Sequence, residues 1–208
     1  DLQIMKEAGE ILKNGGLVAF PTETVYGLGG DGLNARSSEK IYTAKGRPSD
    51  NPLIKHIADM ESLNKIVRQI PEKAKLLAEK FWPGPLTMIF QKSSEVPYET
   101  TGGLESVAVR MPNHPVALAL IQAGGGYIAA PSANTSGRPS PTKAEHVAED
   151  LSGRIDMIVD GGDVGIGLES TIVDFTENIP VILRPGYINQ AMIEAVIGSV
   201  RMDKGLLI

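Results

Sequence analysis

Residues 170–184, STIVDFTENIPVILR, contain two apolar segments separated by a short polar one. The segments 170–175 and 181–184 are rich in Ile and Val, which favours two β-strands. No helical pattern lies between them, so the alternation of strands and helices is irregular at this end of the chain. We therefore expect a mixed β-sheet in an α/β or α+β domain, in preference to a doubly wound parallel sheet.

The rest of the chain reads as short apolar strands and amphipathic helices. Residues 4–12 carry apolar side chains at helical spacing, and Gly15 and Gly16 end that pattern. Further helices are expected near residues 37–44, 60–69, 72–81, 115–122, 142–151 and 189–197. Further strands are expected at 17–20, 53–57, 86–90, 107–111, 127–130 and 156–159.

Two caps and one loop complete this prediction. Ser37 or Ser38 is the expected cap of the helix that ends near residue 44. Thr142 and Glu145 form a T-x-x-E capping box for the helix that ends at 151. The glycine-rich segment after Pro21 is interpreted as a loop.

Composition excludes several functional classes. The chain has 208 residues, of which 42% are hydrophobic and 22% charged, which suits one large globular domain. It has no cysteine, so disulfides, thiolate metal sites and a cysteine nucleophile are excluded. The net charge of −5 disfavours strong nonspecific binding to nucleic acid. No segment approaches 18 consecutive apolar residues, so we expect no membrane association.

Polar loops at strand ends are the candidate site. They are FPTETVYGLGG (20–30), KGRPSDNPLIKHI (45–57), APSANTSGRPSPT (130–142) and GLESTIVD (167–174). The glycines at 27, 29 and 32 match G-x-G-x-x-G, but PTETVY separates them from the preceding strand. A dinucleotide site is therefore not expected, and the chain has neither a P-loop nor a G-x-S-x-G motif.

Basic side chains within these segments suggest an anionic ligand. Lys45 and Arg47 lie in a polar loop that suits phosphate binding. Arg110 and Arg184 each end an apolar run, where a guanidinium must reach an anion or water. His56 follows Lys55 in a strand, and either a structural or a binding role is open for it on this pattern.

Seven motifs, in the same order, resemble the YrdC/Sua5 family of threonylcarbamoyl-AMP synthases, over roughly residues 4–200. They are FPTETVYGLG, IYTAKGRPSDNPLIKHI, FWPGPLT, VAVRMPNHPVALALI, APSANTSGRPSPT, GLESTIVD and ILRPG. The resemblance implies a twisted mixed sheet with helices around a large concave cavity, YrdC/RibB-like. It also implies a catalytic domain over 1–200, with 201–208 beginning a linker towards a second, smaller domain.

The resemblance further implies a nucleotidyltransferase of the cytoplasm. Its substrates would be L-threonine, bicarbonate and ATP, and its products L-threonylcarbamoyladenylate and pyrophosphate. Mg²⁺ would enter with ATP, held mainly by the phosphates and not by a protein metal site. A downstream tRNA threonylcarbamoyl transferase would place the group on an adenosine beside the anticodon, and a weak contact with tRNA itself is possible.

The family's binding residues map onto this chain by motif. The positions implied for L-threonine are Thr24, His56, Arg110, Ala130 and Ser170. Those implied for ATP are Lys45, Arg47, Asn51, Ser106, Ser132, Ser140 and Arg184. Lys45 and Arg47 are the expected catalytic groups, because charge stabilisation and positioning carry such a reaction without a protein nucleophile.

Two alternative functions use the same domain. One is carbamoyl-adenylate formation in hydrogenase maturation, where the domain lies in a long chain with cysteine zinc motifs that this chain lacks. The other is an RNA-binding module without catalysis, which the negative net charge disfavours. Titration with ATP and L-threonine, compared with tRNA alone, distinguishes these hypotheses.

Overall fold

The computed structural model describes residues 2–46, 53–135 and 137–203. Within these residues ten strands form one sheet in the order β10-β9-β8-β4-β5-β3-β6-β2-β1-β7. The pairs β1–β7, β3–β5, β4–β8 and β9–β10 are parallel, and the other neighbours are antiparallel. The predicted mixed sheet is therefore confirmed. The strands are β1 (Val18–Pro21), β2 (Tyr26–Asp31), β3 (Lys55–His56), β4 (Leu86–Gln91), β5 (Ser106–Arg110), β6 (Ile128–Ala129), β7 (Met157–Ile158), β8 (Thr171–Asp174), β9 (Val181–Arg184) and β10 (Arg201–Met202).

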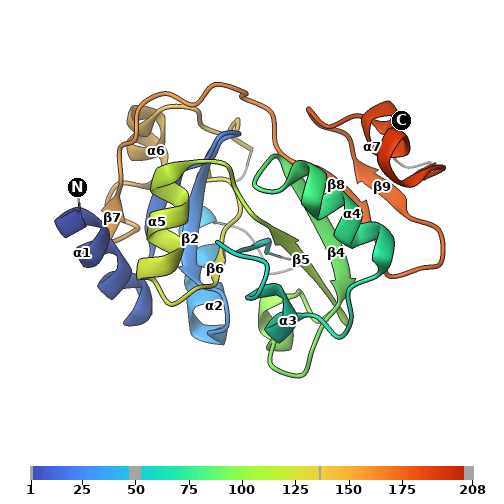
Figure 1. The fold of residues 1–208 in the computed structure, drawn as a ribbon. Coiled ribbons are helices and arrows are strands. Elements are labelled where there is room, and N and C mark those ends of the chain that lie inside the picture. The colour runs from blue at the N-terminus through green and yellow to red at the C-terminus, as the bar shows by residue number, and fades with distance from the viewer. Residues whose placement is uncertain (1, 47–52, 136, 204–208) are drawn as a thin grey trace.

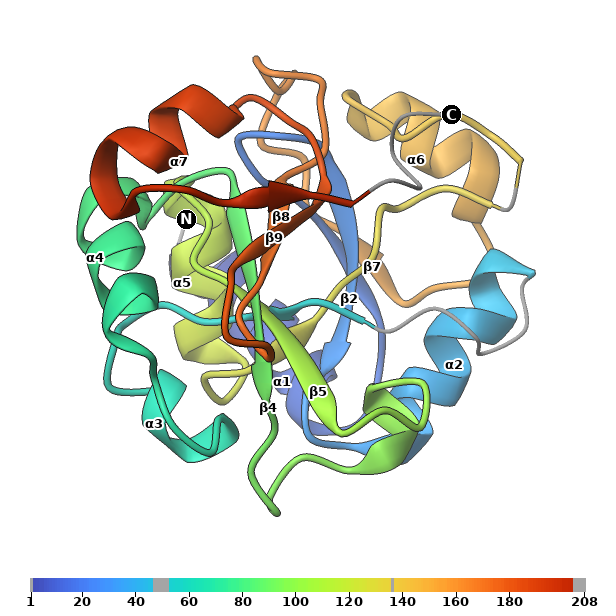
Figure 2. The same ribbon diagram turned by 90° about the vertical axis from the view of Figure 1, so that its right-hand side faces the viewer.

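Helices cover both sides of the twisted sheet (Figures 1 and 2). They are α1 (Leu2–Lys13), α2 (Ala35–Lys45), α3 (Leu63–Ile66), α4 (Glu72–Phe81), α5 (Pro115–Ala123), α6 (Ala144–Leu151) and α7 (Gln190–Ile197), with a 3₁₀ helix at Tyr98–Thr100. Helices α1 and α5 pack together against β1, while α4 and α7 pack together beside β4 and β8. Helices α2 and α6 share a third apolar cluster with β1 and β2. The core is thus divided around the sheet, which leaves room for a cavity between its parts.

Strand β2 was wrongly predicted as a loop, because three glycines within it suggested turns. Its glycines instead allow close packing of neighbouring elements. A Cβ on Gly29 would lie 2.8 Å from Ile128 Cγ2 and 2.9 Å from Phe20 Cε1, so only a residue without a side chain fits between them. The glycine motif therefore serves the sheet, and β2 pairs with β1 and β6.

The predicted helix starts and lengths were partly wrong. Helix α2 begins earlier, because Asn34 caps it by accepting from the backbone N–H of Arg36 at 2.9 Å. Ser37 and Ser38 lie inside the helix, buried, and their hydroxyls have no hydrogen-bond partner among the described residues. Helix α6 begins after Lys143 without a side-chain cap, so the predicted capping box does not form. The predicted helix at 60–69 is only the single turn α3.

The sheet continues past the predicted domain boundary at residue 200. Arg201 and Met202 pair with Val181 and Ile182, because β9 otherwise has an open edge whose backbone groups need partners. Residues 201–202 therefore pair with the sheet, and residues 204–208 lie outside the described residues. Within the part of the chain described here, no helix combines the length and apolar character that crossing a bilayer requires.

Candidate functional site

A cavity of about 390 Å³ lies beside the middle of the sheet. Its walls come from the β1–β2 turn, the last turns of α2, β3, β5, the segment after β6, and the start of β8 with the end of β9. Polar side chains converge there from segments that are far apart in the sequence, as expected of a ligand site. The polar or charged residues of its lining are Thr22, Thr24, Tyr42, Lys45, His56, Arg110, Ser132, Glu169, Ser170 and Arg184.

Most of the residues that the sequence predicted for the site meet in this cavity. The predicted residues that line it are Thr24, Lys45, His56, Arg110, Ala130, Ser132, Ser170 and Arg184. Ser140 lies one step behind the lining, where its hydroxyl donates to Glu169 Oε1 at 3.1 Å. Ser106 begins β5, at the opposite end of that strand from Arg110, and does not line the cavity. Arg47 and Asn51 lie outside the described residues.

A tight turn between β1 and β2 presents the Thr24 hydroxyl. The Thr22 hydroxyl donates to the Val25 carbonyl at 2.8 Å and accepts from the Thr24 backbone N–H at 3.1 Å. The single hydroxyl proton of Thr22 is donated to the Val25 carbonyl. The Thr24 hydroxyl is therefore the donor in the 2.9 Å contact between Thr22 Oγ1 and Thr24 Oγ1. Thr24 Oγ1 is then left as an acceptor.

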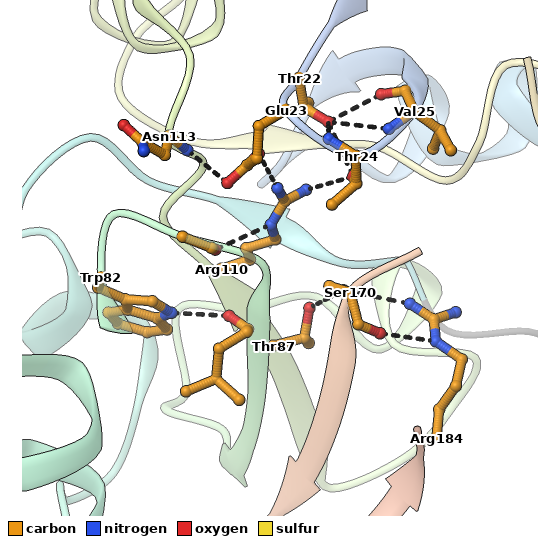
Figure 3. Close-up of polar contacts among 12 residues, drawn as sticks. Thr22, Glu23, Thr24, Val25, Trp82, Thr87, Arg110, Asn113, Ser170 and Arg184 are labelled. Atoms are coloured by element: carbon orange, nitrogen blue, oxygen red, sulfur yellow. Dashed lines mark hydrogen bonds and ion pairs between the residues drawn. The ribbon is translucent and has the colours of Figure 1, made fainter. Parts of the chain in front are cut away.

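Arg110 is the most buried charge of the site and ends β5 (Figure 3). Its guanidinium donates to the Gly84 carbonyl, to Thr24 Oγ1 and to the carboxylate of Glu23. The second carboxylate oxygen of Glu23 accepts from the Asn113 backbone N–H at 2.8 Å. Burial lowers the pKa of Arg110, and the negative charge of Glu23 opposes that shift. Glu23 thus holds the guanidinium in place beside Thr24.

A second arginine organises the opposite wall. Arg184 Nε donates to the Ser170 carbonyl at 2.9 Å, and its terminal nitrogens donate to Glu169 Oε2 at 2.9 Å and to Ser170 Oγ at 3.1 Å. Burial lowers the pKa of Arg184, and Glu169 opposes that shift. These contacts fix the backbone and the hydroxyl of Ser170 at the edge of β8 (Figure 3).

Lys45 reaches the cavity from the last turn of α2. Its ammonium group donates to the Ser132 carbonyl, and its side chain is buried although it carries a charge. Gly46 ends the helix with a φ of 72°, a left-handed conformation that glycine adopts without steric cost. The helix end therefore places one cation beside the 130–132 segment.

His56 lines the cavity as a neutral imidazole. Its Nδ1 donates to the Ile54 carbonyl at 3.1 Å, and the ring packs edge-on against Phe20. Burial lowers the pKa of His56 to about 3, and the charges of Arg110 and Lys55 act in the same direction. Contacts with the carbonyls of Ile54 and Ile128 oppose the shift without cancelling it. The site thus has its positive charge on arginine and lysine and none on histidine at neutral pH.

The comparison with known families supports the sequence resemblance. A family model named Sua5_yciO_yrdC and described as "Telomere recombination" matches residues 10–186. The chain belongs to the Sua5/YciO/YrdC family.

Relatives of this Sua5/YciO/YrdC chain include a threonylcarbamoyl-AMP synthase of Bacillus subtilis, 59% identical over 201 residues. That match covers 96% of this chain and 58% of the relative, so the chain spans little more than half of that protein's length. The structure of Pyrococcus abyssi Sua5 in complex with L-threonine superposes with a TM-score of 0.95 at 54% identity, covering 97% of this chain and 59% of the other. Escherichia coli YciO superposes with a TM-score of 0.82 at 25% identity, covering 90% of this chain and 91% of the other.

Sequence reasoning missed three side chains of this family member's site. Glu23 lies within the quoted PTET motif. Its position between two threonines, in a loop already assigned to the site, could have indicated a role there. Glu169 lies within the quoted GLESTIVD segment, and its carboxylate pairs with Arg184. Thr87, a hydroxyl residue in the apolar run LTMIF, contacts Ser170 but does not itself line the cavity.

The neutral state of His56 predicts a flat pH dependence. We expect the imidazole resonances of His56, measured by NMR, to show no titration near pH 6.5, the ordinary value for histidine. The reason is that burial keeps the ring neutral on both sides of that pH. A titration near pH 6.5 of resonances that disappear in His56→Gln would contradict the prediction.

Lys55 predicts a pH-dependent stability. It is completely buried, its ammonium group donates to the Thr100 carbonyl at 2.9 Å, and burial lowers its pKa from 10.5 to about 7. As the pH falls from 10.5 to 7, Lys55 becomes protonated in the unfolded chain but stays largely neutral in the folded chain. The free energy of unfolding therefore falls in that pH range. One pKa unit corresponds to about 1.4 kcal/mol. We therefore expect Lys55→Met to raise the free energy of unfolding by a few kcal/mol at pH 7, and by less at pH 10.

Urea denaturation at pH 7 and pH 10 tests this stability prediction. Lys75→Met, on the exposed face of α4, is the control and should produce no pH-dependent gain. A gain from Lys55→Met that is equal at the two pH values would mean that burial does not neutralise Lys55.

Proposed function

We propose that this chain carries the catalytic domain of an L-threonylcarbamoyl-AMP synthase. One observation carries the proposal: the five positions expected for L-threonine and three of those expected for ATP line a single cavity. Thr24, His56, Arg110 and Ser170 form one part of it, and Lys45, Ser132 and Arg184 form the other. The names of the Bacillus subtilis and Pyrococcus abyssi relatives agree with this function.

The proposed reaction needs positioning and charge more than a nucleophilic side chain. The amine of L-threonine and CO₂ from bicarbonate form a carbamate, with loss of a proton from nitrogen. A carbamate oxygen then attacks the α-phosphorus of ATP, the new P–O bond forms, and the bond to the β-phosphate breaks to release pyrophosphate. Holding the two reactants in line supplies much of the acceleration of such a step.

The charged side chains of the cavity suit the two reactants, ATP and the amino acid. Lys45 and Arg184 would offset the negative charge of the triphosphate, as would Arg47 by the sequence argument. Arg110 would lie beside the carboxylate or the carbamate of the amino acid. Thr24 and Ser170 would contact its remaining polar atoms.

We propose that Mg²⁺ enters this site with ATP. The carboxylates of Glu23 and Glu169 already accept hydrogen bonds from Arg110 and Arg184, which leaves them poorly suited to act as a dedicated cage. A magnesium ion held chiefly by phosphate oxygens and water fits that donor set better. The ion would neutralise charge on the leaving pyrophosphate.

The product is proposed to serve tRNA modification. A threonylcarbamoyl-adenylate is an activated acyl donor, so a separate transferase would move its acyl group onto an adenosine beside the anticodon. With a net charge of −5, any contact of this chain with tRNA itself would be weak.

Pyrophosphate release tests the function directly. The protein should release pyrophosphate only when L-threonine, bicarbonate, ATP and Mg²⁺ are all present, and mass spectrometry should identify the threonylcarbamoyl adenylate. Release that persists without L-threonine or without bicarbonate would contradict the proposed reaction.

A further inference from the structure

A second hydroxyl lies beneath Ser170, outside the lining of the cavity. Thr87 is in β4, where it pairs with Arg110 of β5 on one side and with Ile172 of β8 on the other. Its side chain is fully buried, and its Oγ1 lies 2.6 Å from Ser170 Oγ (Figure 3). Thr87 therefore lies between Arg110, its neighbour in the sheet, and Ser170, which lines the cavity.

The direction of this hydrogen bond follows from the available partners. Ser170 Oγ is the one hydrogen-bond partner of the Thr87 hydroxyl among the residues that the structure describes. If Ser170 donated to Thr87, the Thr87 proton would be left in a buried position without an acceptor, which is costly. Thr87 is therefore the donor in this pair.

A second donor occupies the other lone pair of Ser170. Arg184 donates to Ser170 Oγ at 3.1 Å, in addition to the bond from Thr87. A hydroxyl has two acceptor sites and one proton. With both acceptor sites filled, Ser170 retains its own proton for a partner in the cavity that it lines.

We propose that Thr87 is a positioning residue that makes the Ser170 hydroxyl a hydrogen-bond donor towards the ligand. Ser170 then requires an acceptor oxygen, such as the side-chain hydroxyl oxygen of L-threonine. Thr24 across the cavity offers the opposite polarity, because its own proton is directed to Thr22. The inference rests on the proposed function, since it specifies how one residue of that site meets the amino acid.

Calorimetric titration with L-threonine tests the role of Thr87. Thr87→Val has nearly the same shape and removes the donor. One acceptor site of the Ser170 hydroxyl is then empty, so that hydroxyl can rotate and its proton no longer has to point towards the ligand. We expect affinity to fall about tenfold, the scale of one lost oriented hydrogen bond. Thr87→Ser restores the hydroxyl and should bind within about twofold of the wild type.

Thr171→Val is the matched control. Thr171 is also fully buried in the same sheet, but its hydroxyl donates to the Ile188 carbonyl at 2.7 Å and not to the Ser170 hydroxyl. Both valine variants should lower the melting temperature to a similar degree, whereas only Thr87→Val should weaken binding. Equal loss of affinity in the two variants would show that Thr87 acts through general stability and would overturn the proposal.

A double-mutant cycle separates an effect through Ser170 from other effects. In the Ser170→Ala background, adding Thr87→Val should change affinity by less than about twofold, because the hydroxyl it orients is absent. A tenfold loss in that background would overturn the inference. If Thr87→Val does not fold, Thr87→Cys takes its place, because a thiol is a weak donor and predicts a smaller loss that also vanishes with Ser170→Ala.

The outcomes distinguish the two proposals. Wild-type protein that binds L-threonine while Thr87→Val binds equally well would overturn the role of Thr87 and leave the function standing. Wild-type protein that shows no binding of L-threonine would overturn both.

Discussion

L-Valine is expected to react about 10⁴-fold more slowly than L-threonine, because a site built around a substrate hydroxyl rejects an analogue that lacks it. Valine matches threonine in shape and replaces the hydroxyl with a methyl group. Thr24, His56 and Ser170 are only 1%, 4% and 3% exposed, so few water molecules can reach them in place of a missing ligand hydroxyl. Polar groups would be left unpaired in a closed site, which is the costly outcome.

L-Serine provides the comparison for this prediction. It keeps the hydroxyl and lacks one methyl group, a loss worth roughly 1–3 kcal/mol or about 10–200-fold. The expected order is therefore threonine, then serine, then valine, measured by pyrophosphate release at saturating ATP and bicarbonate. A rate with valine above that with serine would mean that the cavity selects shape and that our placement of these three side chains around the substrate is wrong.

Lys45→Ala is expected to reduce the rate of pyrophosphate release by about 10²–10³, the usual cost of removing one charge-stabilising group. The ammonium group of Lys45 is held in the cavity by the Ser132 carbonyl, where it can lie against a triphosphate. Arg47→Ala should act in the same direction, on the sequence argument that both basic residues bind phosphate.

Lys40→Ala is the control for Lys45. Lys40 lies on the same helix but is exposed, and its ammonium group donates to the Gly15 carbonyl away from the cavity. It should retain nearly full activity at equal substrate concentrations. Full activity in the Lys45→Ala, Arg47→Ala double variant would remove both residues from the catalytic site.

The sequence predicted strands and helices best where apolar periodicity was unambiguous. Helix α4 and strand β9 have the boundaries that were expected. Strand β2 was missed, because local propensity treats glycine as a turn former and contains no information on the packing of Phe20 and Ile128 against it. The cap of α2 was missed for a related reason, since Asn34 and Ser37 are both good caps and tertiary burial decides between them.

Motifs predicted which residues meet in the cavity, but not how they are paired. Arg110 was expected to reach an anion or water at the end of its apolar run, and its guanidinium is held by Glu23 from a distant turn. Thr87 was not singled out, because only the pairing of β4 with β8 brings it to Ser170. Such pairings depend on strand register, which spacing within a single segment does not reveal.

The arrangement of the sheet also determines when a binding site can exist during folding. Arg110 contacts Thr24 across 86 residues of sequence, and β1 and β7 lie beside each other at one edge of the sheet although the chain between them forms most of the fold. Contacts of such long range form slowly, because the chain loses conformational entropy on closing the long loop before the contacts stabilise it. A ribosome-bound chain that stops before residue 170 lacks Ser170 and Arg184 and should not retain L-threonine. Ligand capture by nascent chains of increasing length would therefore report the completion of the sheet, and not the appearance of any single motif.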